Sequence, residues 1–442
     1  MPLMLRTARA ALLGTTALSL AAHAAGAQSR KPSDELDTRI AQVMSKVVTW
    51  RRDFHEHPEL SNSEKRTAKI VAEHLRALGL DVREGVAGTG VIGVLKGGKP
   101  GKVVALRADM DALPVTEETD LPFKSTVKAT FAGQSVGVMH ACGHDSHTAM
   151  LMGAAEVLTG MRASLPGTVK FIFQPAEEGA PPGERGGAAV MVEQGALENP
   201  HVDAVFALHV WPEEAGKLSY KPGASMSASD QLRIVVRGRQ THGAQPWRGV
   251  DPIVLSAQIV SALQTITARQ TDITAAPAIV TVGTINGGVR FNIIPDNVIM
   301  TGTIRTFDDA MRKDIHLRIA RTAEKIAEAS GGSATVTITL GGSIVWNDPA
   351  LTAQMAPTIA KAAGGKVNSN AVWMPSEDFP SFTKTTPGVY LFLGVNKAGV
   401  AVEEAAANHS TKFFVNEDAM PTGVKALVSL ATDFLASAKT TP

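Results

Sequence analysis

The chain of 442 residues contains a single cysteine, Cys142, and almost no net charge. One cysteine excludes a disulfide framework, so its sulfur is inert packing, a reactive thiol or a metal ligand. Lysine and arginine together number 43 against 42 for aspartate and glutamate, which leaves no basic excess for binding nucleic acid. The composition is 44% hydrophobic and 19% charged, which is typical of a globular protein with roughly two or three domains.

Long apolar runs are also lacking, apart from one at the N-terminus. Arg6 and Arg9 precede a small, apolar stretch over 10–22, and Ala-X-Ala triplets end at Ala24 and Ala27. This layout predicts a cleavable secretory signal peptide over 1–27. The apolar stretch, about 13 residues long, is too short to span a bilayer comfortably. We therefore expect a periplasmic or secreted protein that has no membrane association after cleavage.

The remaining chain alternates between helical and strand patterns. Residues 37–57 and 63–78 show the apolar spacing of amphipathic helices. Five short apolar runs predict buried strands, at 91–95, 103–106, 169–173, 202–208 and 389–393. Strands separated by helices predict an α/β sheet that is covered on both faces.

Residues 223–342 have a different texture. Strand patterns at 231–236, 279–282, 297–305 and 334–340 alternate with helical patterns at 252–269 and 308–329. This β-α-β-β-α-β order predicts a ferredoxin-like α+β module, inserted as a lid or dimerisation domain. The catalytic α/β domain would then comprise 33–222 and 343–442.

Residues that can bind metals or transfer protons follow the predicted strands. They are Asp109 and Asp111 after the second strand, Glu177 and Glu178 after the third, and His209 after the fourth. Cys142 and His144 lie in a loop just before a predicted helix at 146–158. Open α/β sheets bind ligands beyond the carboxyl ends of their strands. The sequence therefore predicts a metal site at this edge, while His55, His140 and His147 are expected at the surface or behind the ligands.

A series of motifs between about residues 50 and 410 resembles one family. The segments are Arg51–Leu60 (RRDFHEHPEL), Leu106–Pro114 (LRADMDALP), Met139–Asp145 (MHACGHD), Phe173–Gly179 (FQPAEEG), Leu208–Val210, Thr241–Ala244, Asn292–Asp296, Gly302–Phe307 and Asn408–Ser410. The chain resembles the co-catalytic metallopeptidase family of aminoacylases and dinuclear-metal carboxypeptidases. Its amidohydrolase branch is the most similar, with the hippurate, N-acyl amino acid and auxin-conjugate hydrolases.

The resemblance implies a two-metal hydrolase. Its metal ligands would be Cys142 in a bridging position, together with His144, Glu178, His209 and His409. Thiolate and imidazole ligands suit zinc, whereas imidazole and carboxylate also suit manganese, nickel or cobalt.

The resemblance also assigns roles outside the metal ligands. Glu177 would be the general base and Asp111 would orient a ligand. Within the inserted module, His242 would stabilise the oxyanion, in cis or in trans, while Asn292 and Arg305 would hold a substrate carboxylate. Gln240 and Thr241 precede His242 where many members of the family have two glycines, so this loop could be set differently. Asp109 receives no role.

These residues predict an exported amidohydrolase that cleaves N-acyl amino acids, including hippurate-like substrates with an aromatic half. A small-dipeptide carboxypeptidase is the alternative enzyme, and a metal-dependent binding protein is the alternative outside enzymes. A homodimer or tetramer would form through the lid.

Overall fold

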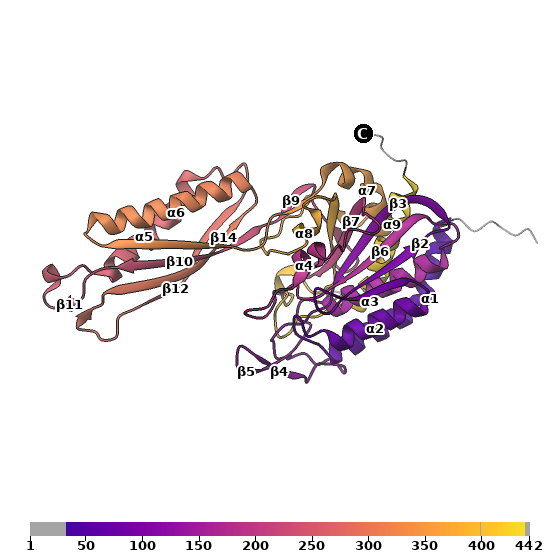
Figure 1. Ribbon diagram of the computed structural model, residues 1–442, viewed down its shortest axis with the longest axis horizontal. Helices are drawn as coiled ribbons and strands as arrows, with labels where there is room; N and C mark the ends of the chain where they lie inside the picture. The colour runs from indigo at the N-terminus through magenta and orange to yellow at the C-terminus, as the bar shows by residue number, and fades with distance from the viewer. Residues whose placement is uncertain (1–31, 398, 438–442) are drawn as a thin grey trace, which may run out of the picture.

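The computed structural model describes residues 32–397 and 399–437, so the predicted signal peptide lies outside the described residues. The described chain forms two lobes joined by a narrow connection (Figure 1). The larger lobe contains an eight-stranded sheet and the smaller lobe a four-stranded sheet. None of the helices that the structure describes has the length and apolar character needed to cross a membrane.

The large sheet has the strand order β1-β2-β6-β3-β7-β18-β8-β17. The central strands β6, β3, β7 and β18 run parallel, whereas β1, β2 and β8 make antiparallel pairs. Their bounds are β1 Asp81–Val86, β2 Gly90–Lys96, β3 Lys99–Asp109, β6 Pro166–Gln174, β7 Ala204–Trp211, β8 Leu218–Ser219, β17 Val367–Asn368 and β18 Gly388–Gly394. The residues that follow β3 and β6 therefore meet the end of β7 at one edge.

Both faces of the large sheet are buried. In β7, Phe206 and Leu208 join one apolar cluster while Val205 and Ala207 join another, because successive strand side chains point to opposite faces. Helices α1, α2, α3, α7 and α9 contribute to the first cluster, and α4 and α8 to the second. The helices are α1 Pro32–Glu56, α2 Lys65–Ala77, α3 His144–Gly160, α4 Gly187–Glu193, α7 Pro349–Ala362, α8 Pro380–Thr383 and α9 Met420–Ala436.

The smaller lobe contains a sheet of order β12-β14-β10-β15, with helices α5 and α6 on one face (Figure 1). Along the chain the elements are β10 Ala228–Arg237, α5 Pro252–Thr265, β12 Ala278–Gly287, β14 Asn297–Thr306, α6 Asp309–Ala329 and β15 Ser333–Leu340. This is the ferredoxin-like order, and its own apolar core lies between helices and sheet. The predicted fold class, α/β with an inserted α+β unit, is confirmed.

Some local predictions need correction. The helix expected at 252–269 ends as an α-helix at Thr265 and continues as a π-helical turn, Ile266–Gln270. His144, expected in a loop, is the first residue of α3. Several short elements carried too little periodicity to be predicted: the hairpin β4 Lys128–Phe131 and β5 Gln134–Gly137, the pair β9 Gly223–Met226 and β16 Val345–Asn347, and the pair β11 Thr241–His242 and β13 Ile293–Ile294.

A buried ion pair holds α6 against the sheet of the smaller lobe. Asp230 on β10 accepts hydrogen bonds from Arg312 Nε at 2.8 Å and from Arg312 Nη2 at 2.5 Å, and its side chain also lies 2.8 Å from His316 Nε2. Burial raises the pKa of Asp230, but the hydrogen bonds and charge of Arg312 outweigh this and lower the pKa below its ordinary value.

Asp230→Asn is expected to lower the free energy of unfolding by about 3 kcal/mol at neutral pH, because Arg312 loses its buried partner. A carboxylate whose pKa is lower in the folded than in the unfolded state stabilises the folded protein. This stabilisation is complete above the unfolded-state pKa of about 4, and it is lost as the pH falls through the folded-state pKa. Urea unfolding measures the free energy of unfolding of wild type and variant near neutral pH and at about pH 3. The difference between the two proteins should be smaller at pH 3. An equal difference at both pH values would contradict the ion-pair account.

Candidate metal and catalytic site

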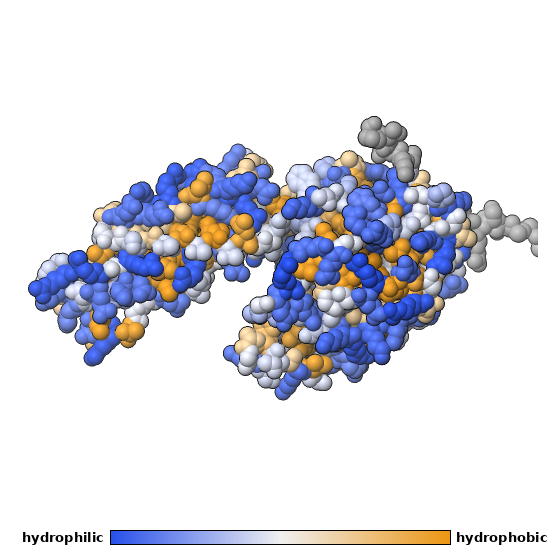
Figure 2. Space-filling view, in the orientation of Figure 1, coloured by the Kyte–Doolittle hydropathy of each residue, from blue (hydrophilic) through white to orange (hydrophobic). Residues whose placement is uncertain are grey.

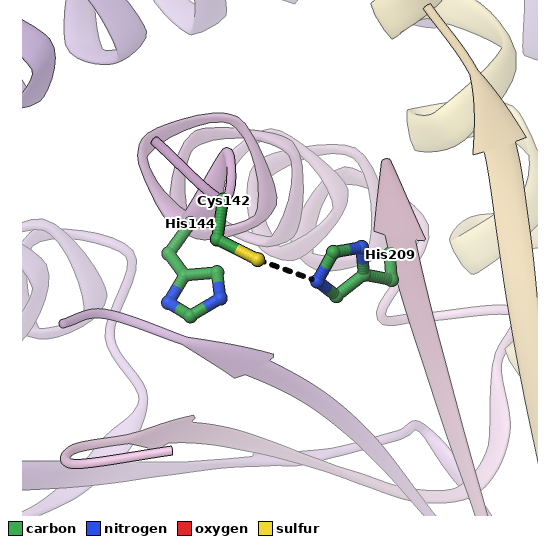
Figure 3. Close-up of side chains that lie close together, drawn as sticks. All are labelled: Cys142, His144 and His209. Carbon is green, nitrogen blue, oxygen red and sulfur yellow. Dashed lines mark hydrogen bonds between the residues drawn. The ribbon is translucent and has the colours of Figure 1, made fainter. Parts of the chain in front are cut away.

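The predicted site residues meet at the carboxyl edge of the large sheet. Cys142 lies two residues before the first residue of α3, His144. The sulfur of Cys142 points toward His209, which lies near the end of β7, and the ring of His144 lies beside the cysteine (Figure 3). Gly143 between them has φ +94°, and a Cβ at this position would lie 2.3 Å from Val210 Cγ2. Only glycine therefore fits this turn, which brings the cysteine and both histidines together.

The two histidines are oriented by backbone carbonyls. His144 Nδ1 lies 2.8 Å from the carbonyl oxygen of Asp111, and His209 Nδ1 lies 2.6 Å from that of Val210. In the neutral form of each ring, donation from Nδ1 leaves the Nε2 lone pair free. His209 Nε2 is 3.4 Å from Cys142 Sγ, and the buried Nε2 of His144 has no hydrogen-bond partner among the described residues. The Nε2 atoms of both rings are therefore placed where they could bind a metal ion.

Cys142 belongs to two groups of donors. Its sulfur lies within 4.8 Å of the donor atoms of His144 and His209, and likewise of those of Glu178 and His409. His409 Nε2 is 3.0 Å from Glu178 Oε1. The two groups share this sulfur, so each group would hold one metal ion with Cys142 common to both.

The carboxylate of Asp111 connects several of these residues. Its Oδ1 lies 3.3 Å from His144 Nδ1, and its Oδ2 accepts hydrogen bonds from the Glu178 N–H at 3.0 Å and from Ser61. Asp111 thus contacts two candidate ligands without belonging to the donor groups around Cys142.

The site is strongly acidic. Burial raises the pKa of Glu177 well above its ordinary value, and the negative charges of Glu377 and Glu178 raise it further. Burial likewise raises the pKa of the Cys142 thiol, and Glu178 and Glu177 add to the effect. Burial alone would lower the pKa of His144, but Asp109 and Asp111 raise it to about 10.

These properties fit a pair of divalent cations. The unpaired buried Nε2 of His144, a thiol and an excess of carboxylates would all be stabilised by positive charge. Soft sulfur and imidazole nitrogen beside carboxylate oxygen match zinc, manganese and related metals.

A cavity of about 530 Å³ opens onto the donors. Cys142, Glu177, Glu178, His209 and His409 line one part of it. Its apolar part is formed by Trp211, Met226, Met374 and Phe392. Phe392 stacks on Trp373 with ring centroids 3.8 Å apart, so this wall is backed by a second aromatic ring.

Arg305 reaches the same cavity from the smaller lobe. It lies on β14, and its Nη1 donates to Ser376 Oγ of the larger lobe at 3.2 Å. The cavity therefore combines metal donors, a cationic guanidinium and an apolar wall. A substrate with an amide, a carboxylate and an apolar group would match all three.

His242 and Asn292 lie elsewhere. His242 is exposed on β11, at the end of the smaller lobe that points away from the larger lobe (Figure 1). The Nδ1 of His242 accepts a hydrogen bond from the Ala244 N–H. Asn292 lies close by, because its carbonyl accepts a hydrogen bond from the N–H of Gly243, the residue after His242. A wide gap separates this end from the larger lobe in the space-filling view (Figure 2). The arrangement brings Arg305, but neither His242 nor Asn292, to the cavity.

Several buried polar residues were not predicted to take part. His147 accepts from the Val210 N–H at 2.8 Å and its Nδ1 lies 2.5 Å from Asp109, so this pair holds the end of β7 beside His209. Arg107 connects Asp109 with Glu377 through hydrogen bonds of 2.5 and 2.7 Å.

The prediction that His55, His140 and His147 could lie at the surface is wrong, because all three are buried. The polar residues at the start of α3, a helix that is otherwise largely apolar and buried, were the available signal, since buried polar groups need partners.

Comparison with known proteins identifies the class. Residues 105–433 match the model of peptidase family M20/M25/M40. "Thermostable carboxypeptidase 1" of Saccharolobus solfataricus is 40% identical over 406 residues, which cover 91% of this chain and 98% of that protein. "N-acyl-L-amino acid amidohydrolase" of Geobacillus stearothermophilus is 40% identical over 301 residues, covering 68% of this chain and 77% of that protein.

A solved structure gives the same result. The YXEP protein of Bacillus subtilis, a dinuclear metal-binding peptidase of the M20 family, has 33% identity and a TM-score of 0.75, with coverage of 90% of this chain and 100% of that one. The chain therefore belongs to peptidase family M20/M25/M40. It is a metallohydrolase that acts on linear amides.

Proposed function

We propose that this protein is an exported amidohydrolase that removes the acyl group from N-acyl amino acids, including hippurate-like ones with an aromatic acyl group. The observation that carries the proposal is the cavity that joins metal donors, Arg305 and an apolar wall. The stacked Trp373–Phe392 pair supports a flat ring as occupant. The carboxypeptidase and amidohydrolase relatives support amide substrates with a free carboxylate.

The metal ligands in this proposal are Cys142, His144, Glu178, His209 and His409, with Cys142 shared. Two divalent ions, manganese or zinc and alternatively nickel or cobalt, would polarise the scissile carbonyl and make the attacking water more acidic. Glu177 accepts the proton of that water and delivers it to the leaving amine. Asp111 fixes the orientation of His144 and the backbone of Glu178.

The lid formed by 223–342 contributes substrate recognition in this proposal. Arg305 binds the carboxylate through its planar guanidinium. His242 and Asn292 would reach the substrate only after the lobes move or from a second chain, since they do not line this cavity.

Arg305→Ala is expected to reduce kcat/KM for an N-acyl amino acid by about ten- to a hundredfold, because a charged hydrogen-bonded contact contributes roughly 1.5–3 kcal/mol. The loss should be much smaller for the matching methyl ester or amide. Arg305→Lys should recover only part of the activity, since lysine lacks the planar fork. Equal losses on acid and ester would show that Arg305 supports the fold instead of reading the carboxylate.

The experiment that tests the substrate class is a hydrolysis screen with added manganese or zinc. One series varies the acyl group on glycine, and a second varies the amino acid under a constant acetyl group. Small dipeptides form a third series, because Arg305 would bind a dipeptide carboxylate equally well and a carboxypeptidase is the second candidate. Hydrolysis of dipeptides with no hydrolysis of acylated amino acids would replace the first proposal with the second.

We also propose that the protein is exported and that it assembles through the lid. Export is supported by the sequence pattern over 1–27, and detection of mature protein in a periplasmic or culture fraction would test it. A homodimer or tetramer through the lid is supported by the edge strand β12, where Ile279 and Ile285 are exposed. Light scattering in solution tests this assembly.

A further inference from the structure

The segment that carries His409 is irregular. It lies between two short 3-10 helices, Val402–Glu404 and Glu417–Ala419, and His409 itself has a positive φ of +69°. Regular hydrogen bonding therefore does not set the position of this candidate ligand. Individual contacts with the rest of the site must do so, and two of them lead to the Cys142 segment.

The first contact is a backbone hydrogen bond from the His409 N–H to the Ala141 carbonyl at 2.8 Å. The second comes from the side-chain amide of Asn408. Its Nδ2 donates to the Cys142 carbonyl at 3.2 Å and to the Val210 carbonyl at 3.4 Å, and lies 3.8 Å from Cys142 Sγ. The Val210 carbonyl is the same acceptor that orients the ring of His209.

One amide group thus contacts the segments of three candidate ligands: Cys142, His209 and the adjacent His409. Two carbonyl acceptors on its nitrogen side fix which way the amide points. The opposite atom, Asn408 Oδ1, is buried without a hydrogen-bond partner among the described residues. A buried acceptor without a hydrogen-bond partner is unfavourable, so packing alone would be better served by an apolar side chain.

We propose that Asn408 is a positioning residue for the metal centre. Its side-chain amide holds Cys142, His209 and His409 at the spacing that retains the metals. The proposal rests on the proposed ligand set and adds a residue that binds no metal in it.

The test compares two substitutions of Asn408 with a control in the same segment. Asn408→Ala removes the amide, and Asn408→Leu removes it while keeping a similar volume. Asn416 is the control, because its amide also ties this segment to another, donating to the Asn396 carbonyl at 3.3 Å and accepting from the Asp418 N–H at 3.0 Å, yet it contacts no candidate ligand. Each protein is loaded with manganese or zinc and equilibrated against increasing chelator, and bound metal is measured by mass spectrometry.

Both Asn408 variants are expected to release metal at about ten- to a hundredfold lower chelator concentration than wild type, because each loses two hydrogen bonds to backbone carbonyls of the site. Asn416→Ala should release it as wild type does. The melting temperatures of the metal-free Asn408 variants should match that of metal-free Asn416→Ala, because the effect belongs to the metal centre.

Wild-type metal retention in both Asn408 variants would overturn the proposal. It would also be overturned if Asn416→Ala lost metal equally, or if the metal-free Asn408 variants melted well below metal-free Asn416→Ala, since Asn408 would then serve general stability. Failure of the wild-type protein to bind any divalent metal would instead refute the proposed function, so the two failures are distinguishable.

Discussion

Glu177→Gln should lower kcat by roughly 10²–10⁴-fold, the usual contribution of a general base, while the protein keeps its full complement of metal. Glu177 lines the cavity beside Cys142 and Glu178. The substitution preserves size and hydrogen bonding but removes the site that accepts a proton. Metal content by mass spectrometry and single-turnover hydrolysis of an N-acyl amino acid measure the two effects separately.

Glu178→Gln provides the contrast. Its Oε1 belongs to the donor group of Cys142 and His409, so this variant should lose metal first and activity as a consequence. Glu184→Gln is the matched control, because Glu184 is an exposed residue of the same segment after β6. Equal metal loss in the Glu177 and Glu178 variants would show that the two residues do not have separate roles as general base and metal ligand. A metal-loaded Glu177→Gln enzyme with normal kcat would exclude Glu177 as the base.

Cys142→Ser is expected to lose metal and activity together, because a hydroxyl is a much poorer ligand than a thiolate for soft divalent metals. In the wild type, bound metal should protect the only cysteine from alkylation. Removal of the metal by a chelator should then make Cys142 available for modification, and the modified protein should not bind metal again.

The alkylation experiment has a clear control within the chain. Because Cys142 is the single cysteine, any incorporated label reports on this sulfur alone. Mass spectrometry of intact protein, with and without chelator, measures the protection. Rapid alkylation of the metal-loaded enzyme with unchanged turnover would exclude a thiolate ligand at Cys142.

The sequence predicts the edge of the sheet where these residues meet, because apolar runs marked the central strands and polar motifs followed them. Asp111, Glu177 and His209 could be placed in this way, since chain direction alone sets where parallel strands end. The sequence shows a glycine between Cys142 and His144. It does not show the positive φ of this glycine or its close approach to Val210, because both depend on packing.

Other parts of the site depend on contacts between distant segments. Arg107 and Glu377 are far apart in sequence, and no local pattern around either residue indicates that they pair. The relation of His242 to the metal donors depends on how the lobes are arranged, which local patterns do not encode. His147 gave a weak signal only, because its partner Asp109 had no recognisable role before the structure placed the two 2.5 Å apart.

We propose that this cavity hydrolyses amides with the help of two bound metal ions. Stepwise addition of manganese or zinc to metal-free protein, with release of the amino acid from an N-acyl amino acid measured at each step, tests the claim most directly. Activity should be absent without metal, rise as metal approaches two ions per chain, and remain absent in Glu177→Gln at every step. Full hydrolysis by the metal-free protein, or saturation of both metals with no hydrolysis of any N-acyl amino acid or dipeptide, would contradict the account.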